Sequence, residues 1–486
     1  MNGYRPRVLA AYIVPMVVLS ASWAQAATLS VGPSKQYATP CAAAAAAEDN
    51  DVIEIDAQGE YGGDVCAIAK NGLTLRGVGG RAKIDAQGKS SGGKAIWVIT
   101  GHDTTVENIE FSGATVADKN GAGIRQEGDN LTVRSCYFHD NDDGILTNAS
   151  TQSQIVVEFS EFSNNGFGDG YSHNMYIGNV ARFTLRYSYS HDAKVGHLVK
   201  SRAAENFILY NRLSGEHGSS SYELDLPNGG TSYVLGNIIE QGASTENPTL
   251  FGYALEGTAA GNPGHALYVV NNTFANDRPN GGTFVNVGAM VDAPALLQNN
   301  VFYGPGTITN QESAIAQSNY SGTDPKFTAS DLLDYTLLSG SPCVDQGTAA
   351  ASVSAFSLTP EWQYVHPAAA RKRSSVGIID IGAYELGNSD ETGPGGGPGS
   401  MAAGTGGAAQ ATGGAMNVQG GEPSISGGSP AQAGGAGMNG DTNGSCACNA
   451  AGRLPRGWAL LGPCCAALAL LGRRLVRACC ARGARP

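Results

Sequence analysis

Short runs of alternating apolar and polar residues recur along most of this chain. The runs are rich in Val, Ile, Leu, Phe and Tyr and are separated by Gly, Asn, Asp and Ser. Alternation over a few residues predicts short, half-buried strands. Five runs are variants of one segment, at residues 130–134, 182–186, 206–210, 232–236 and 266–270. A segment that returns about every 24 to 28 residues, with one longer step of about 35, cannot bury its own apolar face and must stack on its neighbours.

Each run leads into a similar turn, which gives a set of equivalent positions. We take these as Asn108, Ser135, Phe159, Tyr187, Asn211, Asn237, Asn272 and Asn300. Asn at the last four predicts an internal amide ladder, in which each side chain satisfies backbone groups of the neighbouring repeat.

The period and composition predict an all-β fold, a right-handed parallel β-helix with about three short strands per coil. A leucine-rich repeat would need a Leu-rich consensus, and a propeller about 40 residues per blade. Residues 42–47 are all Ala, so we expect a helix that caps the N-terminal end. Residues 380–385 are expected to close the other end. Cys41 and Cys66 are expected to form a disulfide, whereas Cys136 and Cys343 are expected to be isolated.

The flanking segments differ from this β-helix domain, which we place at residues 27–387. Residues 1–26 contain Arg5 and Arg7, an apolar run and small residues before a cleavage site, which is typical of a secretory signal peptide. Residues 388–445 are dominated by Gly, Ala, Ser and Thr and are expected to form a flexible linker.

Residues 446–486 contain a Cys motif, a short apolar stretch expected to be helical and an Arg-rich end. This combination resembles the C-terminal sorting tags of Gram-negative surface proteins, particularly the myxobacterial type; an ordinary tail anchor is the alternative. The resemblance implies an exported protein held at the cell surface or outer membrane through its tail.

The net charge of the chain limits the kinds of molecule that it can bind. The chain carries −12 overall, but Arg5, Arg7 and the seven Arg from Arg453 onward lie outside the β-helix domain, so that domain is more acidic, at about −18. Nucleic acid is an unfavourable partner for such a surface. A polyanionic polysaccharide can bind where basic side chains cluster locally. We expect a monomer.

Several motifs accompany the coil period: Leu73-Thr74-Leu75-Arg76-Gly77, Ser339-Gly340-Ser341-Pro342 and the segment 380–385. With them, roughly residues 28 to 387 resemble the pectate-lyase-like right-handed β-helix superfamily. The resemblance implies the fold and leaves the activity open, since the superfamily holds lyases, hydrolases, epimerases, esterases and adhesins.

Residues 172–177, 196–202 and 222–226 lie one coil apart. Strand alternation predicts that one outward column contains Asn174, Tyr176, Lys200, Arg202, Glu223 and Asp225. Arg125 and Glu256 extend this column, and His197 is expected to face the interior. Stacked coils are about 4.8 Å apart, so these side chains should be neighbours.

This cluster suits β-elimination of a uronate polymer, which needs a base, a proton donor and neutralisation of the substrate carboxylate. We predict that Lys200 is the base, that Arg202 or Tyr176 assists or donates the proton, and that Glu223 and Asp225 hold Ca²⁺. Asn174, Arg125 and Glu256 are predicted to bind substrate. The resembled superfamily includes alginate and chondroitin lyases with a Lys and Arg pair, usually on neighbouring coils; here both lie on one strand.

Three alternatives remain open. The charged column can be a ladder of surface ion pairs. The protein can be a non-catalytic carbohydrate-binding or adhesive protein. It can also be a glycoside hydrolase that uses Glu223 and Asp225, which would lie about 6 to 7 Å apart on one strand.

Overall fold

A computed structural model describes residues 26–388 except 260, 261, 263, 351, 354, 355 and 376. The predicted linker and sorting tag lie outside the described residues, as does all but the last residue of the predicted signal peptide, and these three assignments stay predictions. Among the described residues, no helix is long and apolar enough to cross a membrane.

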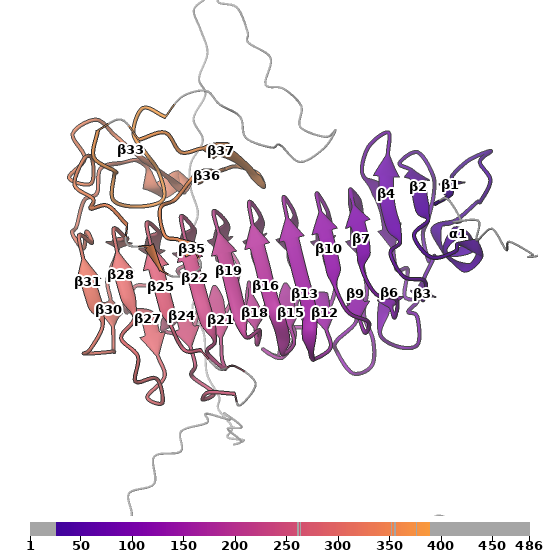
Figure 1. The fold of residues 1–486 in the computed structure, drawn as a ribbon, viewed down its shortest axis with the longest axis horizontal. Coiled ribbons are helices and arrows are strands. Elements are labelled where there is room, and N and C mark those ends of the chain that lie inside the picture. The colour runs from indigo at the N-terminus through magenta and orange to yellow at the C-terminus, as the bar shows by residue number, and fades with distance from the viewer. Residues whose placement is uncertain are drawn as a thin grey trace, which may run out of the picture. The chain divides into compact units, whose positions relative to one another are not determined.

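The described strands stack coil upon coil into three parallel sheets (Figure 1). We call the twelve-stranded sheet A, the ten-stranded sheet B and the nine-stranded sheet C. Each complete coil contributes one strand to A, then one to C, then one to B. Neighbouring strands within a sheet are therefore one coil apart in sequence.

The strand bounds are as follows. Sheet A contains β1 (Thr28–Val31), β2 (Val52–Asp56), β4 (Thr74–Val78), β7 (Thr104–Glu107), β10 (Leu131–Arg134), β13 (Ser150–Glu158), β16 (Val180–Arg186), β19 (Glu205–Leu209), β22 (Thr231–Leu235), β25 (Leu267–Val270), β28 (Leu296–Gln298) and β31 (Ile315–Gln317). Sheet B contains β3 (Cys66–Ile68), β6 (Ala95–Ile99), β9 (Ala122–Gln126), β12 (Asp143–Thr147), β15 (Met175–Ile177), β18 (Lys200–Ser201), β21 (Leu224–Leu226), β24 (Thr249–Tyr253), β27 (Thr283–Val287) and β30 (Thr307–Thr309). Sheet C contains β5 (Ala82–Asp85), β8 (Ile109–Ser112), β11 (Tyr137–His139), β14 (Glu161–Ser163), β17 (Tyr189–His191), β20 (Arg212–Ser214), β23 (Ile238–Gln241), β26 (Thr273–Asn276) and β29 (Val301–Tyr303).

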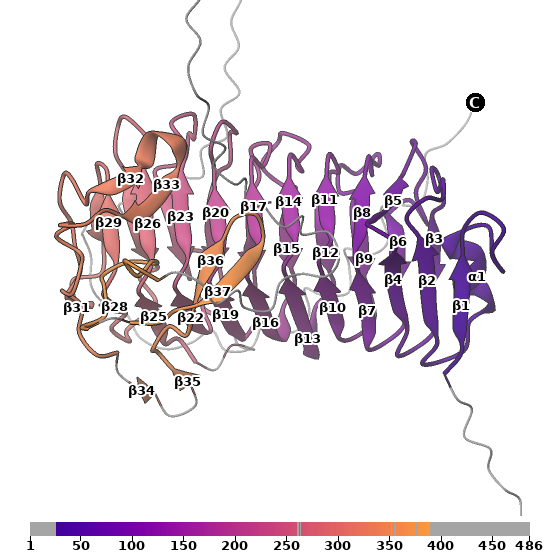
Figure 2. The ribbon, with the colours of Figure 1, turned by 90° about the horizontal axis from the view of Figure 1, so that it is seen from above.

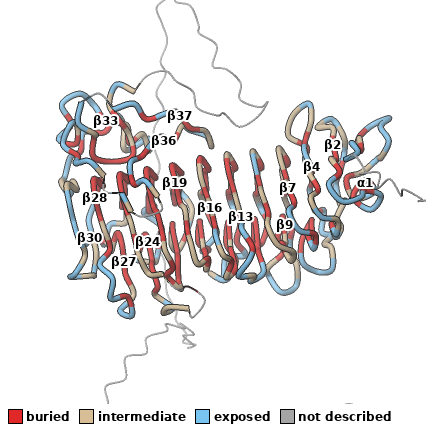
Figure 3. Tube along the Cα trace, in the orientation of Figure 1, coloured by how far each residue is buried: buried red, intermediate tan, exposed pale blue. Residues whose placement is uncertain are grey.

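Alternating side chains form the core between the sheets. In β10, Leu131 and Val133 are buried, whereas Arg134 is exposed. In-register pairing places like residues over one another, so the interior rings of Phe111, Phe138 and Phe162 stack with centroids 5.0 and 4.8 Å apart. Burial follows this pattern along the whole stack (Figure 3). The core is thus a continuous apolar column, to which each coil adds a layer.

The predicted amide ladder lies at the corner between sheets A and C. The backbone N and the Nδ2 of Asn211 both donate to Oδ1 of Asn237, at 2.9 and 3.0 Å. Asn237 repeats this with Asn272, Asn272 with Asn300, and Asn300 with Asn319. The ladder is therefore confirmed and extends one coil beyond the predicted members.

The eight turn positions that we took as equivalent fall into two sets, and the later set is shifted by one residue relative to the earlier one. Ser135, Phe159 and Tyr187 have positive φ, and in later coils Tyr210, one residue before the ladder, has that conformation. The ladder position in the earlier coils is instead Ser160 or Ser188, and the Ser188 backbone N donates to Asn211 Oδ1 at 3.0 Å. Because Ser takes the place of Asn in these earlier coils, the sequence pattern did not reveal the true register.

The N-terminal end carries the one α-helix of the described residues, α1 (Pro40–Ala46) (Figure 1). Thr39 precedes it, and the Ala42 backbone N donates to Thr39 Oγ1. Ala43 and Ala44 are buried against the first coil. A disulfide between Cys41 and Cys66 links α1 to β3.

The chain after sheet A forms a C-terminal segment, residues 327–388, made of three small hairpins and one 3₁₀ turn. These are β32 (Phe327–Ala329), η1 (Ser330–Leu332), β33 (Asp334–Leu337), β34 (Ser352–Val353), β35 (Phe356–Ser357), β36 (Trp362–Val365) and β37 (Ala369–Lys372). The segment lies over the outer faces of sheets A and C near the C-terminal coils (Figure 2). Phe356 contacts Phe207 and Tyr233 on sheet A. Sheet C supplies Tyr303, which contacts Phe327.

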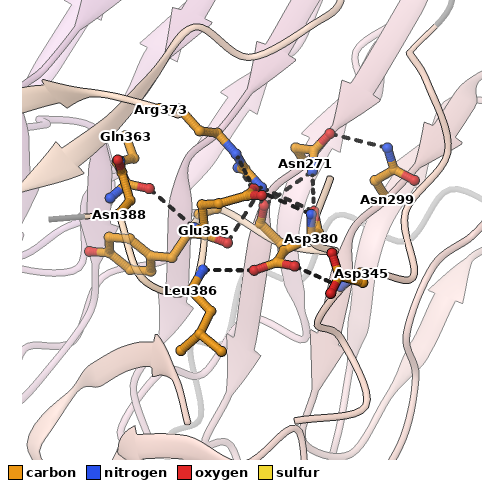
Figure 4. Close-up of polar contacts among 12 residues, drawn as sticks. Asn271, Asn299, Asp345, Gln363, Arg373, Asp380, Glu385, Leu386 and Asn388 are labelled. Carbon is orange, nitrogen blue, oxygen red and sulfur yellow. Dashed lines mark hydrogen bonds and ion pairs between the residues drawn. The ribbon is translucent and has the colours of Figure 1, made fainter. Parts of the chain in front are cut away.

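Residues 380–385 attach this segment to the side of the stack and do not close its end. Asn271 Nδ2 donates to the Asp380 carbonyl at 2.8 Å, and the Gly382 backbone N donates to the Asn299 carbonyl at 2.8 Å. Arg373 is fully buried, donates from Nε to Glu385 Oε2 at 3.0 Å and reaches three backbone carbonyls. Figure 4 shows this network. Residues 380–385, which we expected to close the end of the stack, therefore attach the C-terminal segment to its side.

Candidate active site

Strand register on sheet B brings the predicted site residues into one column. Tyr176 on β15 pairs with Lys200 on β18, and Lys200 pairs with Asp225 on β21. Their sequence neighbours Met175, Ile177, Leu224 and Leu226 are buried in the interior. Because alternate residues of a strand point to opposite faces, the column points out of the stack.

Arg202 follows β18 and turns back over this column. Its Nε donates to Tyr176 Oη at 2.9 Å. One guanidinium Nη is 2.7 Å from Glu256 Oε2, and the other donates to the side chain of Asn228. Arg202 thus joins strands three coils apart through a phenol, an amide and a carboxylate.

Lys200 lies between two carboxylates. Its Nζ is 3.7 Å from Asp225 Oδ2 and 3.5 Å from Glu256 Oε1. The same Nζ is 5.6 Å from the ring centroid of Tyr176. Glu256 is half exposed and contacts both cations, so the cluster alternates positive and negative groups.

The Asp225 carboxyl is almost completely buried. Burial raises the pKa of Asp225 to about 6, although the charges of Lys200 and Arg202 act in the opposite direction. A carboxyl group with this pKa can exchange a proton close to neutral pH.

His197 differs from its predicted position. Its Nδ1 lies 3.2 Å from Asp225 Oδ2, so the ring faces the site and not only the interior. Burial and Lys200 lower the pKa of His197 to about 3. The His197 backbone N donates to His173 Nδ1 at 3.0 Å, and burial also lowers the pKa of His173. Two neutral imidazoles, with ring centroids 4.4 Å apart and tilted by 39°, thus lie next to the column.

These histidines were missed as site residues. His173 lies two residues before β15 and His197 three residues before β18, and the two are 24 residues apart in sequence. A histidine shortly before each of two consecutive sheet B strands is the signal that could have identified them.

Two predicted residues, Glu223 and Asn174, are buried and do not belong to the outward column. Glu223 is fully buried, and its carboxyl accepts from Ser220 and Gln241 at 3.3 and 3.4 Å. Asn174 is also fully buried, and its Oδ1 accepts from Asn165 Nδ2 at 2.9 Å within a second amide ladder. Each residue immediately precedes its strand, so strand alternation does not extend to it. The predicted outward placement of Glu223 and Asn174 is therefore wrong.

A groove of about 420 Å³ lies on the N-terminal side of the column; Tyr176 and Arg202 line it, whereas Lys200 and Asp225 lie beside it. Arg125 on β9 lies at one side and Arg202 at the other, with Leu146 and Tyr176 between them on the floor. Arg125 Nη2 donates to Asn148 Oδ1 at 3.1 Å. Arg125 Nε is buried, has no hydrogen-bond partner among the described residues and lies 3.9 Å from Glu127 Oε1. Two guanidinium groups therefore face one hollow.

Asp143, which also lines this groove, was not predicted. Its Oδ1 accepts from the His173 backbone N at 2.7 Å, and burial raises the pKa of its carboxyl well above the usual range. A larger hollow of about 820 Å³ at the C-terminal coils contains none of the predicted site residues. Its ionisable lining consists of Asp277, Arg278 and Tyr303. The concentration of convergent polar groups favours the smaller groove as the site.

Comparison with known proteins gives one family match. Residues 66–239 match the family described as right handed beta helix region, which spans β3 to β23 and includes Tyr176, Lys200 and Asp225. No curated protein sequence matches the chain.

Similar solved structures include three enzymes. A pectate lyase has 12% identity and a TM-score of 0.45, covering 74% of this chain and 96% of its own. An alginate lyase from Paenibacillus sp. has 15% identity and a TM-score of 0.37, covering 61% and 99%. A pectin methylesterase from Aspergillus niger has 13% identity and a TM-score of 0.30, covering 61% and 85%. The fold itself rests on the strand register and the family match: the described part of the chain is a right-handed parallel β-helix, as predicted.

Proposed function

We propose that the groove binds an acidic polysaccharide and that the side chains of the column cleave it by β-elimination. The observation that carries this proposal is the hydrogen bond from Arg202 Nε to Tyr176 Oη at 2.9 Å, next to Lys200. A phenol that accepts from a guanidinium keeps its own proton available for another acceptor. This is the arrangement that protonation of a leaving oxygen requires.

Tyr176 is the proposed proton donor. As the bond between C4 and the glycosidic oxygen breaks, the Tyr176 proton passes to that oxygen, and the phenolate left behind is stabilised by the positive charge of Arg202. Arg202 in turn is oriented by Glu256 and Asn228.

Lys200 is the proposed base. After its own proton has passed to solvent, the Lys200 amine takes the C5 proton, and the electron pair of the C–H bond forms the new double bond between C4 and C5. The ammonium group that this step leaves on Lys200 is stabilised by Asp225 Oδ2, at 3.7 Å, and by Glu256 Oε1, at 3.5 Å.

Arg125 is proposed to hold the substrate carboxylate. A paired carboxylate withdraws electrons from C5 more strongly, which makes the C5 proton more acidic. The position of Arg125 on the groove wall, across Leu146 from Tyr176, supports this role.

The predicted Ca²⁺ site does not fit the side chains. Glu223 binds Ser220 and Gln241, whereas Asp225 contacts Lys200 and His197, so the two carboxylates do not converge. One group in the described part of the chain, His191, Asp192 and Glu216, has atoms close enough for a metal, but Glu216 already accepts from Arg212. We therefore assign neutralisation of the substrate carboxylate to the guanidinium groups.

A panel assay tests the proposal. Full-length protein is incubated with pectate, alginate and glycosaminoglycans, and ultraviolet absorbance reports the unsaturated product. We expect product on at least one polymer, undiminished by a calcium chelator. Lys200→Ala should reduce the rate about 100-fold or more, while Lys83→Ala, at an exposed lysine on β5, should not.

The alternatives give different outcomes. Binding without new unsaturated ends would overturn the lyase and support a non-catalytic carbohydrate-binding or adhesive protein. New reducing ends without unsaturation would support a hydrolase. The observation that favours the hydrolase is the raised pKa of Asp225, which suits a general acid, with Glu256 across Lys200 as the second carboxylate. Display of the groove at the cell surface is part of the same proposal.

A further inference from the structure

The turn between β14 and β15, residues 164–174, carries two exposed aromatic side chains. Phe167 is 50% exposed and Tyr171 is 85% exposed. Glycines surround them, and Gly166, Gly168 and Gly170 all have positive φ, from 81 to 117°. Residues with a side chain rarely adopt these φ angles, so glycine is needed for this backbone path. The path projects both rings outward.

The turn is anchored at both its base and its middle. Its base is fixed by the Asn165–Asn174 pair of the second amide ladder. The Phe167 backbone N donates to Ser172 Oγ at 2.7 Å, which closes the loop. Lys119 Nζ lies 3.4 Å from Asp169 Oδ2 and 4.4 Å from the Phe167 ring centroid. Phe167 is thereby used to hold the loop, whereas the Tyr171 ring has no such contact among the described residues.

Tyr171 is also part of the groove wall. It lines the same hollow as Arg125, Leu146, Tyr176 and Arg202. The groove therefore combines an exposed aromatic ring and an apolar floor with two guanidinium groups. A uronate pyranose has matching chemistry, because one ring face is covered by C–H groups and its edge carries hydroxyls and a carboxylate. Apolar walls with a few placed polar groups are the usual composition of a ligand site.

We propose that Tyr171 stacks on the pyranose unit adjacent to the one that Tyr176 and Arg202 contact. This inference rests on the proposed function and adds a binding subsite to it. Stacking requires only a C–H face, so Tyr171 contributes affinity and register along the chain, while Arg125 and Arg202 select for the carboxylates.

A second hollow, of about 510 Å³, continues past the strand ends and shares Ala149 and Asn179 with the groove. It is lined by polar residues 150–152 and Asp129. The two hollows together accommodate several sugar units. Affinity should accordingly increase with oligosaccharide length, and the contribution of Tyr171 should be absent for a single uronate.

Binding calorimetry on the full-length chain tests this. Lys200→Ala serves as parent to prevent cleavage, and oligogalacturonates and oligoalginates of increasing length are the probes. Tyr171→Ala should weaken binding of the longer oligomers about 10-fold, and Tyr171→Phe should bind like the parent. Leu332→Ala, at a 78% exposed side chain on η1, is the matched control and should also bind like the parent.

The outcomes separate the two proposals. If the parent binds oligouronates and Tyr171→Ala binds equally well, the stacking subsite is overturned and the proposed function survives. If Tyr171→Phe weakens binding as much as Tyr171→Ala, the hydroxyl is responsible and stacking is again overturned. If the parent binds none of the probes, the inference and the proposed function fail together. Thermal unfolding of each variant verifies that it is folded.

Discussion

Burial sets the protonation of several acidic side chains in this protein. The carboxyl groups of Asp143, Glu223, Asp225 and Glu240 are all nearly inaccessible, and burial raises the pKa of each. Glu240 on β23 has a pKa of about 7, with Ser214 Oγ and the Glu216 backbone N donating to its Oε2. The fold therefore stabilises the neutral form of these groups.

Glu240→Gln tests the consequence for stability. Below pH 4.5 the carboxyl is protonated in both folded and unfolded chains; as pH rises to about 7, only the unfolded chain loses the proton. The free energy of unfolding of the unmodified protein should fall over this window by on the order of 3 kcal/mol from this group. The amide cannot ionise, so the variant should lack that part of the fall.

Denaturant unfolding at several pH values measures the effect. The exposed Glu312→Gln serves as control and should run parallel to the unmodified protein. Parallel curves for Glu240→Gln as well would show that Glu240 does not titrate in this window.

Residue spacing predicted part of the site. Tyr176, Lys200 and Asp225 lie within strands, where alternation gives the correct face. Glu223 and Asn174 lie one residue before their strands, and His197 lies three residues before β18. Alternation gives no information at such positions, because the backbone there turns a corner. The contacts of Arg202 with Glu256 and Asn228 depend on turns that the sequence pattern does not specify.

The corner between sheets A and C is built from two positions. The first has positive φ, for example Tyr187 at 57° and Tyr210 at 58°. The second is the amide or hydroxyl of the ladder. An interior Asn occupies both its acceptor and its donors, since Asn237 accepts twice from Asn211 and donates to Ile208 and Asn272. The corner is thus held by side-chain hydrogen bonds that are buried away from water.

Asn237→Ala should destabilise the stack. It removes the acceptor for the backbone N of Asn211 and leaves the Ile208 carbonyl without its side-chain donor, all in a buried setting. The expected loss in unfolding free energy is about 2 to 5 kcal/mol. Chemical denaturation measures it, with the exposed Asn280→Ala as control, expected within about 0.5 kcal/mol of the unmodified protein. A loss no larger than that of the control would refute the structural role of the ladder.

The C-terminal segment covers two of the three sheets. It buries outer aromatic residues of sheets A and C, among them Tyr189 and Tyr233, together with Tyr187 at the corner between them, and leaves the groove on sheet B uncovered. The sequence showed the motif at residues 380–385 but not its location, because lateral docking depends on side chains of distant coils. Arg373 connects the segment internally, being paired with Glu385 in complete burial.

Arg373→Met should therefore loosen the C-terminal segment. It leaves the Glu385 carboxylate buried without its partner and frees three carbonyls, so a loss of about 3 to 5 kcal/mol is expected. Limited proteolysis should cleave first within residues 341–388. Arg76→Met, at an exposed pair with Glu54, should lose under about 1 kcal/mol. Equal protease resistance of both variants would contradict the role of Arg373 in holding the C-terminal segment together.

The turns between sheets differ in how much their length varies. From β10 to β29, two residues always join sheet A to sheet C. The turn from sheet C to sheet B ranges from residues 140–142 to residues 164–174, and the longer one carries Tyr171. An insertion in the two-residue turn from sheet A to sheet C would break the amide ladder. An insertion in the turn from sheet C to sheet B leaves the strand register unchanged. Turns of constant length therefore keep the stack in register, so the wall of the groove can change by replacement of one variable turn while the stack stays the same.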